Sequence, residues 1–220
     1  MTLSGTLFIG TLLVSTLIAS IVQSAAHANQ WQLQLFDQDG KPLDDAVVEL
    51  TALNPAQAVE QSGPLEATIT QQQLNFVPFV SAIQTGTLVD FPNLDRTRHH
   101  VYSFSAAKVF EIQLYHDRPE APILFDQAGI VALGCNIHDY MEAYLFISDS
   151  PWLTVTDSTG QARFDALPAG RYQLKLWHPF QQAEKAPIEI SIPDDAIPHR
   201  FQLQIEHRPK QPTPQRGFGG

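Results

Sequence analysis

The chain contains very little sulfur. Its 220 residues include one cysteine and two methionines, one of which is the initiator. A single cysteine cannot form a disulfide within the chain. It also excludes metal centres built on two or more thiolates, such as zinc ribbons or a dinuclear copper site bridged by two thiolates.

Positive charge is scarce as well. The chain has 13 Lys and Arg against 23 Asp and Glu, which gives a formal net charge of -10. Proteins that bind nucleic acids present a basic face, so this class is nearly excluded. An acidic surface instead favours a partner with a basic docking face.

The N-terminal segment lacks the basic start that is usual in an export signal, because residues 1–28 contain no Lys or Arg. An apolar run from Leu7 to Val22 is nevertheless followed by Ala26-His27-Ala28, a small-x-small pattern typical of a signal-peptidase site. The run of about 16 residues is shorter than the roughly 20 needed to span a bilayer. We expect a cleaved signal over 1–28 and a periplasmic mature protein with no membrane contact; a retained anchor is the alternative.

No long 3.6-residue period occurs after this segment, whereas two-residue alternation recurs, as in Trp31–Phe36. Gly, Pro, Asn and Asp separate many short apolar runs, a pattern typical of an all-β sandwich or barrel. The tail over 207–220 is rich in Gly and Pro and is expected to be disordered. Strands are predicted at 31–36, 46–50, 74–80, 88–91, 100–104, 110–115, 130–133, 144–147, 153–156, 162–164, 172–177, 188–192 and 201–205.

Both sulfur-bearing residues beyond the initiator fall in one predicted turn, with the spacing Cys135-x2-His138-x2-Met141. Copper that cycles between Cu(I) and Cu(II) favours a soft thiolate, imidazole nitrogens and a weak axial thioether. A trigonal site needs a second histidine, and the candidates are His99 and His100, which lie upstream at the start of a predicted strand. The sequence therefore predicts one mononuclear copper site.

Each of these residues also has an ordinary structural explanation. A lone buried cysteine is usually inert, and a methionine in a β protein usually packs in a core. Zinc is a weaker alternative to copper, because methionine is not a zinc ligand and structural zinc sites prefer several thiolates. A Cys-His nucleophile pair is a further alternative, but no oxyanion-hole motif accompanies it.

Residues 67–149 resemble a cupredoxin, the blue-copper electron-transfer fold. The ligand loop is similar to the short loop of amicyanin rather than the longer loop of plastocyanin, and residues 91–141 also resemble periplasmic proteins of the methylamine-utilisation type. The resemblance implies a Greek-key β-sandwich with one type 1 copper ion. It rests on Leu74-Asn75-Phe76-Val77-Pro78, Ile83, Gly86, Val89, Phe91, Asn93, Asp95, His99-x-Val101 and Cys135-x2-His138-x2-Met141.

Carried over to this chain, the family's ligands are His99, Cys135, His138 and the axial Met141. Cupredoxins usually have a small polar residue where this chain has His100. Adjacent residues in a strand point to opposite faces, so only one histidine of the pair can face the metal. The His-x-Val alignment favours His99, which leaves His100 as an outer partner or the alternative ligand.

The resemblance implies one-electron transfer rather than enzymatic catalysis. The electron would pass through the solvent edge of His138 to a redox protein such as a cytochrome or a dehydrogenase, and no nucleic acid is involved. Two alternatives remain: a copper carrier or sensor, and a structural or adhesion module with a vestigial metal site. The residues expected to form an apolar docking rim are Pro78, Phe79, Ile137 and Tyr140.

The flanking segments, 29–66 and 150–206, resemble two halves of a carboxypeptidase-regulatory-like (transthyretin-like) β-sandwich. The first half carries Phe36-Asp37-x2-Gly40-x-Pro42, and the second carries Asp157-x2-Gly160 and Leu167-Pro168-Ala169-Gly170-x-Tyr172. The cupredoxin segment would then be an insertion between the halves, which exposed loops tolerate. Edge extensions of one larger sandwich are the alternative.

Overall fold

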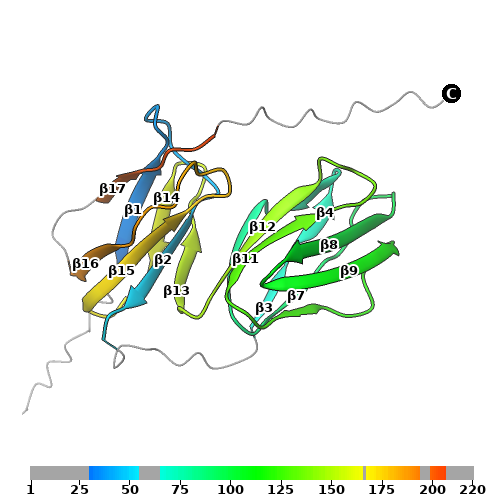
Figure 1. Cartoon of the computed structure of the whole chain (residues 1–220), viewed down its shortest axis with the longest axis horizontal. Helices are drawn as coiled ribbons and strands as arrows, with labels where there is room; N and C mark the ends of the chain where they lie inside the picture. Colours follow the sequence, from blue (N-terminus) through cyan, green and yellow to red (C-terminus); the bar gives the residue numbers. More distant parts are fainter. Residues whose placement is uncertain (1–29, 55–64, 166, 194–198, 207–220) are drawn as a thin grey trace, which may run out of the picture.

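The computed structural model describes residues 30–54, 65–165, 167–193 and 199–206 (Figure 1). These residues form seventeen β-strands and no α-helix, which confirms the predicted all-β fold class. Within them, no helix is long and apolar enough to cross a membrane. The predicted signal (1–28) and the predicted disordered tail (207–220) fall outside the described residues.

The segments at the two ends of the described chain form a first unit, which we call the flanking sandwich. Its two sheets enclose one apolar core that contains Trp31, Leu33 and Leu35 from the N-terminal segment and Tyr172 and Leu174 from the C-terminal one. One sheet has the strand order β14 (Gln161–Phe164), β1 (Trp31–Phe36), β17 (His199–Gln202); the other has the order β13 (Trp152–Val155), β2 (Val47–Ala52), β15 (Gly170–Trp177), β16 (Ile188–Ile192).

Two similar turns shape this unit. In each, an aspartate side chain accepts hydrogen bonds from the backbone two and four residues later: Asp37 from Asp39 and Lys41, and Asp157 from Thr159 and Gln161. Each turn also places a glycine at positive φ, 77° for the first and 73° for the second. The Asp-x2-Gly pattern in both halves therefore encodes the same backbone turn.

The intervening strands form a second unit, the central sandwich, with its own apolar core. The core includes Phe91, Val101, Phe125 and Leu145, and it also contains Cys135 and Met141. Its largest sheet has the strand order β6 (Val80–Gln84), β12 (Glu142–Ser148), β11 (Gly129–Gly134), β8 (His99–Ser105), β9 (Lys108–Tyr115). A second sheet has the order β10 (Ile123–Phe125), β7 (Thr87–Asp90), β3 (Glu66–Thr68), and a third pairs β4 (Thr70–Gln72) with β5 (Asn75–Val77).

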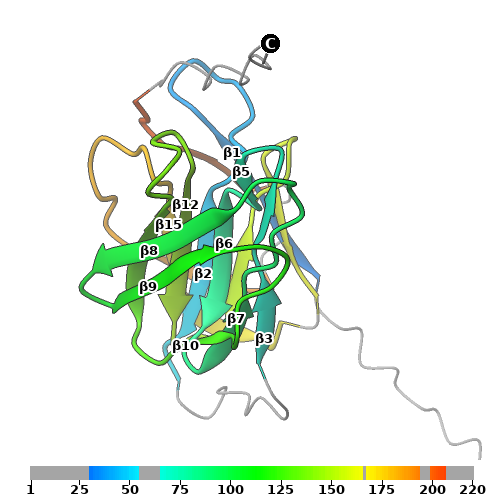
Figure 2. The same ribbon diagram turned by 90° about the vertical axis from the view of Figure 1, so that its right-hand side faces the viewer.

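The two sandwiches lie side by side and share a third apolar cluster (Figures 1 and 2). Val47 and Trp177 come from the flanking sandwich, and Val80 and Phe146 from the central one; all four are buried. The rings of Phe146 and Trp177 are 5.6 Å apart, at a distance typical of favourable aromatic contacts. Burial of these large side chains fixes the central sandwich against its neighbour.

Candidate metal centre

Three potential metal-binding atoms meet at one end of the central sandwich. The side chains of His99, Cys135 and His138 each offer one ligand atom, and these atoms all lie within 4.8 Å of one another. The Sγ atom of Cys135 is 3.9 Å from Nδ1 of His99 and 3.7 Å from Nδ1 of His138. Both imidazoles therefore turn the same ring nitrogen toward the sulfur.

Strand pairing explains how residues 36 positions apart come together. His99 is the first residue of β8, and Cys135 directly follows β11, which is the antiparallel neighbour of β8 in the sheet. The start of one strand thus lies beside the end of the other. His138 is added by the next turn, which is closed by a 2.9 Å hydrogen bond from the backbone N–H of Met141 to the carbonyl of His138.

The site favours a thiolate at Cys135. Burial raises the pKa of this thiol, but hydrogen bonding with His99, the backbone N–H groups of His100 and Ile137, and His138 outweighs it and lowers the pKa to about 6. A thiolate is the form of cysteine that binds metals. The metal-binding form of Cys135 is therefore already favoured at neutral pH by groups of the protein itself.

A carboxylate orients the first histidine. Nε2 of His99 donates to Oδ2 of Asp95 over 2.9 Å, and Asp95 also accepts the backbone N–H groups of Gln73 and Leu74 at 2.8 and 2.9 Å. Burial raises the pKa of Asp95, but these hydrogen bonds outweigh it and lower the pKa. Metal-binding histidines usually donate their second ring N–H in this way, which fixes the tautomer and the ring plane. The other ring nitrogen, Nδ1, faces the sulfur of Cys135 and would bind a metal in place of its proton.

Nothing in the sequence pattern indicates this role for Asp95, although the residue is among those that carry the family resemblance. We predict that Asp95→Asn lowers copper affinity about 10- to 100-fold, the usual cost of losing an outer hydrogen-bond partner. The measurement is competition with a chelator of known copper affinity. Asp126→Asn is the matched control, because Asp126 lies at the surface in a pair with Lys108. Equal copper affinity in the Asp95 variant and this control would contradict the orienting role.

The neighbouring histidine lies outside the cluster. Nε2 of His100 is 2.8 Å from Oε1 of Glu111, and its ring is 5.6 Å from the ring of Tyr102. The two histidines thus make separate contacts, as expected for adjacent residues of a strand. This placement supports His99 over His100 as the ligand, and the ligand assignment itself stays a prediction.

Met141, the predicted axial ligand, is buried in the same core cluster as Cys135. Of the predicted docking rim, Pro78 is exposed, Ile137 is 46% exposed, and Tyr140 is half-buried with its ring 5.9 Å from that of His138. Phe79 is half-buried and has a second set of contacts, because its ring lies 5.7 Å from that of Phe180 in the flanking sandwich. The axial role and the rim stay predictions.

Among known proteins, this chain is similar to several solved structures. No protein-family model and no curated protein match the chain. A Cu-containing nitrite reductase (NirK) from Thermus scotoductus SA-01 matches at 25% identity with a TM-score of 0.36, covering 44% of this chain and 27% of the reductase. This chain therefore matches only about a quarter of the reductase's length.

Two further matches extend over nearly the whole of smaller proteins. A novel purple cupredoxin from Nitrosopumilus maritimus matches at 20% identity with a TM-score of 0.33, covering 37% of this chain and 99% of that protein. Amicyanin from Paracoccus versutus (Thiobacillus versutus) matches at 18% identity with a TM-score of 0.32, covering 48% of this chain and 99% of that protein.

Proposed function

We propose that this chain is a copper-binding electron-transfer protein. A single type 1 copper ion would be held by His99, Cys135 and His138, with Met141 as the axial ligand. The observation that carries the proposal is the convergence of two imidazole Nδ1 atoms on one thiolate-forming sulfur at the end of a β-sandwich.

The chemistry of these donors fits copper. One thiolate with two imidazoles suits a copper ion that changes oxidation state, and the buried thioether of Met141 supplies the weak fourth donor. When bound, copper would supply a reversible one-electron couple. The protein's own contribution is rigidity: Asp95 fixes His99, and hydrogen bonds hold the sulfur of Cys135. His138, which is only half-buried, is partly accessible from the surface.

The burial of the site favours electron transfer over copper delivery. His99 and Cys135 are 0% and 3% exposed, and both are held by neighbouring groups. A copper carrier must release its ion to a partner, whereas here the ion would be held by two side chains that expose almost no surface. We therefore place the protein as an electron carrier between redox proteins, with the periplasm as its predicted compartment.

The test is the visible and electron-paramagnetic-resonance spectra of the purified full chain loaded with Cu(II). We expect an intense visible thiolate-to-copper band at one copper per chain, followed by reversible bleaching on reduction. A colourless protein at full copper occupancy would refute the type 1 assignment. Rapid loss of the reduced ion to a moderate chelator would instead support the carrier.

A further inference from the structure

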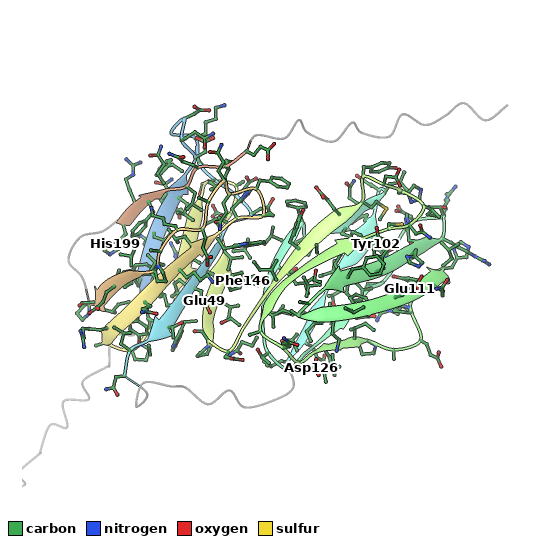
Figure 3. The ribbon with its side chains drawn as sticks, in the orientation of Figure 1. Glu49, Tyr102, Glu111, Asp126, Phe146 and His199 are labelled. Atoms are coloured by element: carbon green, nitrogen blue, oxygen red, sulfur yellow. The ribbon has the colours of Figure 1, made fainter. Side chains whose placement is uncertain are left out.

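An exposed apolar pair lies on the outer face of the large sheet of the central sandwich. Phe104 on β8 is 82% exposed and Val109 on β9 is 67% exposed. They are direct partners in the β8–β9 register, so together they form one continuous patch. Figure 3 shows Tyr102 and Glu111, from the same two strands, on this sheet. We call this region the Phe104 surface.

The Phe104 surface borders a groove that reaches the metal centre. The groove has a volume of about 360 Å³, and the residues that line it include Tyr102, Phe104, Cys135, Asp139 and Glu142. The residues of the predicted docking rim, Pro78, Phe79, Ile137 and Tyr140, are not among those that line it. The groove is therefore a second approach to the ligand residues, separate from the rim around His138.

Tyr102 connects this surface with Cys135. Its ring lies over the backbone of Gly134, where an added Cβ would be only 2.7 Å from Cζ of Tyr102. A side chain at position 134 would displace the ring, so glycine is needed for this close approach. The ring of Tyr102 is also 5.2 Å from that of Phe104. Packed aromatic contacts thus run from the exposed patch to the residue directly before Cys135.

The charges around the groove are negative. Asp139 and Glu142 line it, and no Lys or Arg of the described chain does so. Glu111, directly opposite Tyr102 in the register, adds an exposed carboxylate. Lys108, at the start of β9, is paired with Asp126 over 3.0 Å. An apolar centre with an acidic margin matches a partner whose docking face is apolar and basic.

We propose that the Phe104 surface docks a basic one-electron redox protein. A second copy of this chain fits less well, because self-association would bring Asp139, Glu142 and Glu111 of both copies toward one another. The choice of a redox protein rests on the proposed function, since docking here would place the partner against Tyr102 beside Cys135. The docking itself uses surface residues and does not require a bound metal.

The test is calorimetric titration of the full chain with a basic c-type cytochrome, in the metal-free and the copper-loaded forms. The double variant Phe104→Ser/Val109→Ser should raise Kd about tenfold in both forms, because central apolar contacts dominate such interfaces. Leu124→Ser is the matched control, since Leu124 is a 43% exposed apolar residue on the other sheet, and it should leave Kd unchanged. Added salt should weaken binding, and an acidic c-type cytochrome should bind at least tenfold less tightly.

Three other outcomes would overturn the proposed docking. If the double variant binds like Leu124→Ser, the Phe104 surface is not a docking site. If only Ile137→Ser weakens binding, the partner docks at the rim around His138. If gel filtration shows a dimer that the double variant disperses, the occupant is a second copy. A colourless copper-loaded protein that still binds the cytochrome through Phe104 would refute the proposed function and leave the docking surface standing.

Discussion

Cys135→Ser should abolish the intense visible band of the copper-loaded protein. The band requires a covalent copper–thiolate bond, and this chain has no other cysteine to replace the ligand. A serine hydroxyl is a hard donor that remains protonated at neutral pH. We therefore expect complete loss of the band and a large fall in copper affinity.

The measurement is the visible spectrum during titration with Cu(II), together with thermal unfolding of the metal-free variant. Serine is nearly isosteric with cysteine, so the metal-free variant should still fold. Asn136→Ser is the matched control, because Asn136 is the exposed next residue of the same turn. This control should keep the band. A Cys135→Ser protein that stays blue would show that the thiolate is not the source of the colour.

The sequence predicted most strands because apolar and polar residues alternate within them. Trp31–Phe36 alternates in burial along its whole length, as its sequence does. The segment 74–80 was predicted as a single strand, and that prediction is wrong. The structure has a turn with positive φ at Gln73 and Leu74, then β5, then an interruption at Pro78 before β6. Proline lacks the N–H that a continuous ladder needs, which accounts for the interruption.

Three short strands were missed: Glu66–Thr68, Thr70–Gln72 and Ile123–Phe125. Three residues are too few to display a two-residue period, so such strands are defined only by their partners in the sheet. β3 and β10, for example, both pair with β7. The cluster between the two sandwiches was missed for a related reason. Trp177 and Phe146 each fit an ordinary core pattern, and only the packing of the two units brings them together.

The metal centre, too, could be predicted from the sequence only in part. Cys135, His138 and Met141 lie within seven residues, so their association was visible in the sequence. The contact of His99 with Cys135 depends on the pairing of β8 with β11, and the sequence alone left His99 and His100 as alternatives. Local spacing therefore predicts a ligand loop, whereas tertiary pairing supplies the second histidine.

Replacing each of the two adjacent histidines in turn should have opposite effects on the signal of the copper-loaded protein. His99→Ala should destroy the type 1 signal, because it removes one of the two imidazoles next to the sulfur and leaves Asp95 without its ring partner. His100→Asn should largely keep the signal. Its side chain pairs with Glu111 away from the cluster, and its backbone N–H, which supports Cys135, remains in the variant.

The measurement is the electron-paramagnetic-resonance spectrum of both copper-loaded variants, with thermal unfolding of each metal-free form as the control for folding. Both imidazoles are buried, so each variant should lose some stability, on the order of 1–3 kcal/mol for a buried polar contact. If the two metal-free variants are equally stable but only one of them keeps the type 1 signal when loaded with copper, the residue whose replacement removes the signal is the ligand. The other histidine is then a packing residue. If His99→Ala keeps the native signal and His100→Asn loses it, His100 is the ligand. The Asp95–His99 pair would then serve only to hold the turn around Gln73 and Leu74.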